Sequence, residues 1–215
     1  MKVLVVASHP DDEVLGCGGT IAKHVANGDE VHVAIMSTGV TSRDDYGQGF
    51  ELLDAAYESK MVLGYKPQWI LEYPDNEMDS VPLLDIVKSV EAFVHNLKPD
   101  IVYTHHAGDL NIDHRITHQA VMTACRPLPG CSVKTILCFE VPSSTEWGQG
   151  FEPNWFVDIS DTWEKKRDAL VAYMSEMREF PHPRSYDGVW HLANLRGATV
   201  GVEMAEAFMV ARRIC

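Results

Sequence analysis

A short apolar run near the start of the chain ends abruptly in charged residues, and this junction constrains the fold more than any other feature. Residues 3–7 are too apolar for an exposed strand and too few for a membrane-spanning helix. Such runs are typical of strands buried on both faces in a parallel sheet. The run leads into His9-Pro10-Asp11-Asp12-Glu13. Because functional groups collect beyond the carboxyl ends of parallel strands, we expect a functional site here.

The residue types in this cluster point to a metal ion. Histidine and aspartate are common ligands of divalent ions such as zinc, and crowded carboxylates repel one another unless a cation neutralises them. Pro10 keeps the residues before it extended, which lets His9 and Asp12 converge while Asp11 points elsewhere. The alternative is a polar loop that caps the following helix, with Asp11 or Asp12 as the N-cap.

The rest of the chain alternates between strand and helix patterns, as expected for one α/β domain over residues 1–215. A helix follows the acidic cluster and ends at Gly28, and its glycines let it lie close on the sheet. Asp113 and Asp161 are the expected N-caps of the helices predicted at residues 114–124 and 162–177. The predicted strands span residues 3–7, 30–36, 68–73, 101–104, 135–142 and 155–159, and the other predicted helices span 50–63, 81–97, 114–124 and 162–177.

A second group of ligand-type residues follows the strand at 101–104. Four of the ten histidines lie between His105 and His118. His114 and His118 share one helix face, so both could bind one ion, although a surface position for His118 is the simpler interpretation. Together with His9 and Asp12, His114 would complete two histidines and one carboxylate, the ligand set of catalytic zinc hydrolases. Asp11 would then be free to act as a general base.

Other polar residues at the predicted sheet edge are candidates for substrate binding. Asp75 lies at the end of the strand at 68–73. Arg43 follows the second strand, and its five donors suit an anionic or hydroxyl-rich ligand. Pairing of Arg43 with Asp44 or Asp45 at the surface is equally compatible with the sequence.

Composition excludes several partners and favours a cytoplasmic protein. The net charge of -13 argues against nucleic acid or an anionic membrane as the partner. We see no signal sequence and no run of about 20 apolar residues that could span a membrane. The five cysteines are scattered and form no CxxC motif, which favours a reducing compartment. The glycines at 16–19 do not match a GxGxxG dinucleotide fingerprint.

The two polar motifs resemble those of the zinc-dependent N-deacetylases of the PIG-L/LmbE-like superfamily. The likeness extends over nearly the whole chain. It rests on His9-Pro10-Asp11-Asp12-Glu13, Asp75-Asn76, Asp113-His114-Arg115, Pro181-His182-Pro183-Arg184-Ser185 and the segment from Arg196 to Phe208. The resemblance implies a Rossmann-like three-layer sandwich with a mostly parallel sheet and a site at the carboxyl ends of the strands. It also implies a homo-oligomer as one possible assembly.

Carried over by position, the resemblance implies His9, Asp12 and His114 as ligands of zinc, or of another divalent ion, and Asp11 as the base. The implied substrate is a small molecule with an acetamido sugar. Several family members place a histidine three residues before the last ligand, where this chain has Asn111. An asparagine can donate a hydrogen bond to an oxyanion, but it cannot act as a charged acid.

A different histidine would therefore have to supply the acid. We favour His182 because two prolines hold it, with His105, His106 and His118 as alternatives. Arg43, Arg184 and Asp75 are the candidates for sugar contacts.

The predicted reaction is hydrolysis of an N-acetyl group by metal-activated water. Two alternatives stay open at this point. One is a zinc amidase that acts on a longer acyl chain or on a thiol–sugar conjugate. The other is a metal- or sugar-binding module without catalysis, which a free carboxylate beside the metal argues against.

Overall fold

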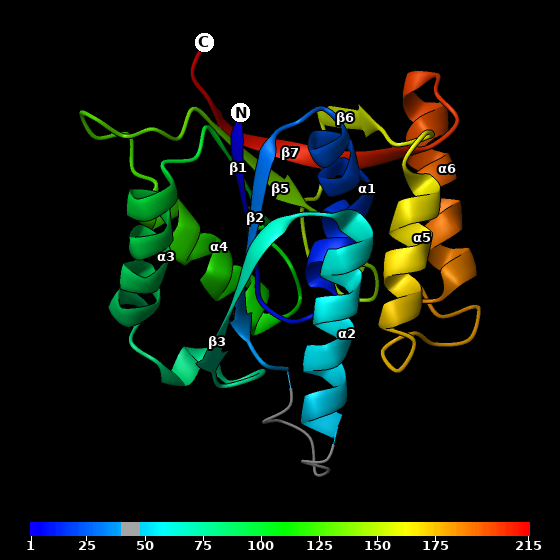
Figure 1. Ribbon diagram of the computed structural model, residues 1–215, viewed down its shortest axis with the longest axis horizontal. Coiled ribbons are helices and arrows are strands. Elements are labelled where there is room, and N and C mark those ends of the chain that lie inside the picture. The colour runs from blue at the N-terminus through cyan, green and yellow to red at the C-terminus, as the bar shows by residue number, and fades with distance from the viewer. Residues whose placement is uncertain (40–47) are drawn as a thin grey trace.

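One seven-stranded sheet forms the centre of the computed structural model, which describes residues 1–39 and 48–215 (Figure 1). The strand order is β3-β2-β1-β4-β5-β7-β6. β1 to β5 run parallel, β7 is antiparallel to β5, and β6 is antiparallel to β7. The strands are β1 (Lys2–Ala7), β2 (Glu30–Ser37), β3 (Lys66–Tyr73), β4 (Ile101–His105), β5 (Thr135–Phe139), β6 (Trp155–Asp158) and β7 (Ala205–Arg213).

Helices cover both faces of the sheet, which confirms the three-layer α/β sandwich. α3 and α4 pack on one face, and α1, α2, α5 and α6 lie on the other (Figure 1). The α-helices are α1 (Asp12–Ala26), α2 (Gln48–Leu63), α3 (Leu83–Leu97), α4 (Ile112–Ala124), α5 (Trp163–Ala172) and α6 (Tyr186–Val200). Two short 3-10 turns are Met78–Ser80 and Thr145–Trp147. No described helix has both the length and the apolarity needed to cross a bilayer.

The strand order creates a crevice at one edge of the sheet. From β1 the chain proceeds outward to β2 and β3, and it then returns to place β4 on the other side of β1. In open parallel sheets, the helices that follow two such strands lie on opposite faces and leave a crevice between them. Residues that follow β1 and β4 therefore meet there, although about a hundred positions separate them in the sequence.

α1 lies close against the sheet because glycines face it. A Cβ atom at Gly16 would lie 2.4 Å from the ring of Phe139, and one at Gly19 would lie 2.8 Å from Ile159. The helix is interrupted at Cys17, whose φ is -149° and ψ is 25°. Beyond the interruption, the amides of Gly19 and Thr20 donate to the buried carboxylate of Glu206 on β7 at 2.9 and 2.7 Å. Glu206 therefore caps the second part of α1.

The structure corrects several predicted boundaries. Asp113 does not cap α4: Asn111 is the N-cap, and its Oδ1 accepts from the amides of Asp113 and His114. The Asp113 carboxylate instead accepts from the amides of Asn76 and Met78 at 2.7 and 3.0 Å.

Two other elements are shorter than predicted, and one cap is different. α5 has Thr162 rather than Asp161 at its N-cap and ends at Ala172 rather than at residue 177. The strand predicted to continue to residue 142 ends at Phe139. In both cases the chain leaves the regular element where it turns toward the crevice.

Candidate active site

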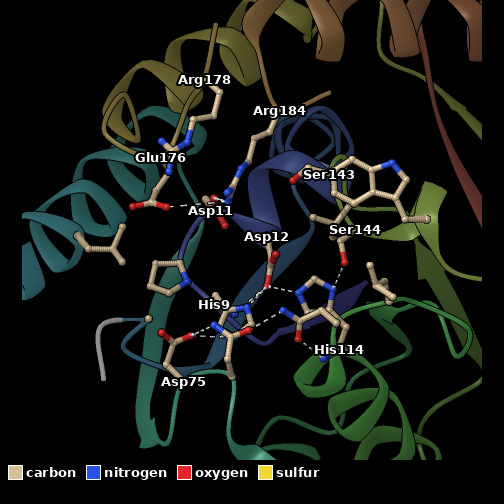
Figure 2. Close-up of a pocket in the computed structure, with 18 residues that line it drawn as sticks. His9, Asp11, Asp12, Asp75, His114, Ser143, Ser144, Glu176, Arg178 and Arg184 are labelled. Atoms are coloured by element: carbon tan, nitrogen blue, oxygen red, sulfur yellow. Dashed lines mark hydrogen bonds and ion pairs between the residues drawn. The ribbon is translucent and has the colours of Figure 1, made fainter. Parts of the chain in front are cut away.

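A cavity of about 550 Å³ opens at the carboxyl ends of the strands (Figure 2). Its walls come from the segments that follow β1, β2, β3, β4 and β5, and from the turn after α5. Most of the lining side chains are polar. They are His9, Pro10, Asp11, Asp12, Gly39, Leu52, Asp75, Asn76, Leu110, Asn111, His114, Val141, Ser143, Ser144, Trp147, Glu176, Arg178 and Arg184.

Two histidines and a carboxylate converge in this cavity, as predicted. Asp12 Oδ2 lies 3.2 Å from His9 Nδ1 and 3.3 Å from His114 Nε2. The three potential ligand atoms all lie within 4.8 Å of one another. Asp12 also accepts from the amide of His9 at 2.8 Å, which fixes the carboxylate against its own loop. This donor set fits a zinc ion with a position left open.

Each histidine uses its second ring nitrogen to contact a carboxylate. His9 Nε2 lies 2.9 Å from Asp113 Oδ2 and 3.3 Å from Asp75 Oδ1. His114 Nδ1 lies 3.1 Å from Asp109 Oδ1. Carboxylates in this position fix the ring orientation and tautomer of metal-binding histidines. The carboxylate contacts of His9 Nε2 and His114 Nδ1 thus fit a site in which the other nitrogen of each ring binds the metal.

His9 belongs to a second group that could hold an ion, formed with Asp75 and Asp113. The Asp113 carboxylate already accepts two backbone amides, and it lies at the base of α4 with no exposed surface. It is therefore suited to orienting His9. The group with Asp12 and His114 is the better candidate because all three of its members line the cavity.

A third histidine lies behind the ligands. The ring of His105 stacks on that of His114 with the centroids 3.9 Å apart, and it has no exposed surface. Its Nε2 accepts from the amide of Ser8 at 2.8 Å, so it cannot also donate to Asp12, 3.5 Å away. Burial lowers the pKa of His105 well below its usual value. His105 is thus a neutral packing partner of His114.

Asp11 lies next to the ligand group but outside it. It has a φ of 105°, a left-handed conformation that is costly for a residue with a side chain. Its amide donates to the buried carboxylate of Glu13 at 3.1 Å, and Tyr173 donates to the other oxygen of Glu13 at 2.8 Å. Glu13 and Tyr173 therefore fix the backbone that directs Asp11 toward the cavity.

The carboxylate of Asp11 accepts from Arg184 Nη1 at 3.0 Å, and Glu176 lies 3.9 Å from the same nitrogen. Burial and the charge of Asp12 raise the pKa of Asp11 to about 8, and the charge of Arg184 opposes this rise. Asp11 still lines the cavity, so the pairing with Arg184 leaves room for a reactant beside it. A carboxyl with a pKa near neutrality suits proton transfer.

The predicted acid residues do not reach the cavity. His182 lies outside its lining, and its Nδ1 accepts from the amide of Arg184 at 3.1 Å within its own loop. His105, His106 and His118 also lie outside it. His106 contacts the carbonyl of Gln149, and His118 contacts that of His105.

The remaining candidates are partly engaged in holding the site together. Asp75 lines the cavity but contacts His9, which favours an orienting role. Asn111 lines it as well, with its oxygen used in capping α4 and its Nδ2 donating to Asn76 at 2.9 Å. Arg184 reaches the cavity and pairs with Asp11 there. Arg43 lies outside the described residues.

Several lining residues were not predicted from the sequence. Glu176 was placed inside a predicted helix that in fact ends earlier, and Arg178 directly follows that predicted helix. Both form the wall around Asp11 with Arg184 (Figure 2). Ser144 belongs to a loop whose shape could not be predicted. Asp109 lies outside the lining and contacts His114 Nδ1. It was within the second polar motif, and its spacing of five residues from His114 was the one available signal.

Comparisons with known proteins place the chain in a family. The family model PIG-L, described as GlcNAc-PI de-N-acetylase, matches residues 4–125. The diacetylchitobiose deacetylase of Thermococcus kodakarensis is 30% identical over 200 residues, which cover 83% of this chain and 71% of that protein.

Two solved structures share the fold over nearly the whole chain. The N,N'-diacetylchitobiose deacetylase from Pyrococcus horikoshii has a TM-score of 0.81 at 24% identity and covers 98% of this chain and 84% of its own. The 4-carboxy-2-hydroxymuconate hydratase GalB from Pseudomonas putida has a TM-score of 0.79 at 21% identity. The match covers 100% of this chain and 97% of the GalB chain. The fold alone therefore does not specify a reaction. The family match extends over more than half of the sequence and includes both polar motifs, and the chain belongs to the PIG-L deacetylase family.

Proposed function

We propose that this chain is a metal-dependent N-deacetylase that removes the acetyl group from an N-acetylglucosamine-type sugar or glycoconjugate. The observation that carries the proposal is the convergence of His9, Asp12 and His114 in one cavity, with the carboxylate of Asp11 beside them. A binding module has no need of a second carboxylate next to its metal. The deacetylase relatives support an acetamido sugar as the substrate.

His9 Nδ1, Asp12 Oδ2 and His114 Nε2 would hold the cation, with zinc favoured by two imidazole nitrogens and one carboxylate oxygen. Another divalent ion would also be compatible with these ligands. When bound, such a cation polarises an amide carbonyl and makes water more acidic.

A bound cation would favour the ionised form of Asp11, which would then accept the proton of the water that attacks the acetamide carbon. Arg184 favours the charged form of this carboxylate, and the contact of its amide with Glu13 holds it in place. The same carboxyl would then return the proton to the leaving nitrogen, since His182 and the other candidate acids lie outside the cavity. The products are acetate and the free amine. Asn111 has a second Nδ2 hydrogen that could be donated to the developing oxyanion.

The test is to change Asp11→Asn and to measure acetate release and metal content together. Loss of a general base lowers turnover by about 10²–10⁴-fold, while the zinc content should stay that of the unchanged protein. Asp85→Asn, an exposed position on α3, is the matched control and should have no effect. Undiminished acetate release from the zinc-loaded Asp11→Asn protein would contradict the proposal. Absence of acetate from every acetamido sugar, with the unchanged protein, would also contradict it.

A further inference from the structure

Two exposed apolar side chains lie at the opening of the cavity. Trp147 and Leu110 both line it, yet 55% and 54% of their surfaces remain exposed. The other large apolar lining residues, Leu52 and Val141, are only 3% and 4% exposed. Trp147 and Leu110 therefore carry the apolar surface of the lining that a bound ligand could still bury.

The backbone that carries Trp147 is held in place by contacts that do not involve the indole ring. The loop at residues 143–149 begins at Ser143, whose φ of 71° lies in the left-handed region. Farther along, the amide of Gln149 donates to the carbonyl of Gly108 at 2.7 Å. A Cβ atom at Gly148 would lie 2.1 Å from that same carbonyl oxygen, so this approach requires glycine. The exposed ring thus stands on a fixed support.

The same loop contacts the metal-binding end of the cavity. The hydroxyls of Ser144 and Thr145 donate to Asp109, which holds His114. Ser144 Oγ also lies 3.4 Å from His114 Nδ1. Trp147 follows only three residues later, in the 3-10 turn that Thr145 begins. The loop at residues 143–149 therefore connects the proposed reaction centre with the apolar side chains at the opening of the cavity.

We propose that Trp147, with Leu110 beside the cavity mouth, forms a subsite for a sugar ring attached to the reacting acetamido sugar. This inference rests on the proposed deacetylase function. A pyranose ring offers an apolar C–H face to an indole and hydroxyl groups at its edge. The amides of Asn76 and Asn111 and the hydroxyl of Ser143 line the same cavity and can bind such hydroxyls. A long acyl chain would fit poorly because most of the lining is polar.

The test compares N-acetylglucosamine with N,N'-diacetylchitobiose as substrates for the unchanged protein and for the variants Trp147→Ala, Trp147→Phe and Trp190→Ala. Trp190 is the control, since it is also exposed, at 42% on α6, and lies outside the cavity lining. We expect Trp147→Ala to lower kcat/KM for the disaccharide about tenfold, mainly through KM, and to change that for the monosaccharide less than about twofold. Trp147→Phe should restore most of the disaccharide activity, and Trp190→Ala should change neither substrate.

An equal loss on both sugars, or no loss on either, would overturn the subsite while leaving the deacetylase function intact. If the unchanged protein releases acetate from another acetamido sugar but from neither of these two, the subsite is wrong and the deacetylase function stands; if it releases acetate from no acetamido sugar, both are wrong. Since Trp147 is exposed, its substitution should not unfold the protein. Unchanged circular dichroism and zinc content in Trp147→Ala verify this directly.

Discussion

At the scale of single residues, the site depends on one strained backbone position. Asp11 holds a φ of 105° because Glu13 accepts from its amide, and Tyr173 occupies the other oxygen of Glu13. All three residues are buried. The strain is therefore stabilised from behind the cavity, by groups that do not line it.

This arrangement predicts that Glu13→Gln lowers turnover without loss of the metal. A glutamine offers one acceptor oxygen where the glutamate offers two, so either Asp11 or Tyr173 loses its partner. A displaced catalytic group costs up to about a hundredfold in rate, and we expect a fall in kcat of about tenfold to a hundredfold with little change in KM. Steady-state kinetics and zinc analysis measure both effects.

Tyr173→Phe serves as the comparison for Glu13→Gln. It removes one donor to Glu13 but leaves the contact between Glu13 and the amide of Asp11. We expect it to retain more activity than Glu13→Gln. Wild-type kcat in Glu13→Gln would show that the backbone of Asp11 does not need this contact.

At the scale of elements, α1 is joined to the distant strand β7 through one buried carboxylate. Glu206 caps the second part of α1 and pairs with Lys166 Nζ at 2.6 Å, and that lysine also donates to the carbonyl of Leu15 at 2.8 Å. Both charged side chains are almost fully buried. Breaking a buried pair from one side is costly because the other charge stays behind.

We therefore predict that Glu206→Gln destabilises the fold by about 3–5 kcal/mol. For a chain of this size, such a loss lowers Tm by roughly 10 °C, which a thermal melt would detect. Arg167→Ala removes exposed ion pairs on the same helix as Lys166 and should leave Tm nearly unchanged. If Glu206→Gln had the same Tm as the unchanged protein, the contacts of Glu206 with α1 and Lys166 would not stabilise the fold.

The type of each element could be predicted from the sequence more readily than its ends. The core strands were recognisable because buried parallel strands are continuous apolar runs, such as residues 3–7. The ends of α5 and β5 were wrong because tertiary contacts determine where the chain turns. The same contacts bring Glu176, Arg178 and Ser144 to the cavity, and local pattern does not encode them. The meeting of His9, Asp11, Asp12 and His114 could be predicted because the first three lie just after β1 and His114 lies at the start of the helix that follows β4.

At the scale of the whole molecule, the sheet order concentrates charge at one crevice. Burial alone would lower the pKa of both candidate ligands, His9 and His114. Hydrogen bonds to Asp113 and Asp12 instead raise the pKa of His9 to about 10, and the charge of Asp12 with the hydrogen bond to Asp109 raises that of His114 to about 9. In the metal-free protein both rings are therefore protonated at neutral pH.

The direction of the pH dependence follows from these values. Zinc binds only neutral imidazole, so each ring must release its proton. We predict that the affinity for zinc rises steeply between about pH 6 and pH 8, as measured by competition with a chelator whose own protonation is corrected for. Both folded-state pKa values exceed the usual histidine pKa of 6.5, so the protonated rings stabilise the metal-free fold below that pH. This stabilisation is lost as the pH rises through about 9–10. A zinc affinity independent of pH would contradict the charged histidines.

The most direct measurement is anomalous diffraction at the zinc edge, from crystals grown with one equivalent of zinc. We predict one peak within bonding distance of His9 Nδ1, Asp12 Oδ2 and His114 Nε2, with Asp11 beside it and not coordinated. A peak between His9, Asp75 and Asp113, or coordination by Asp11, would contradict it.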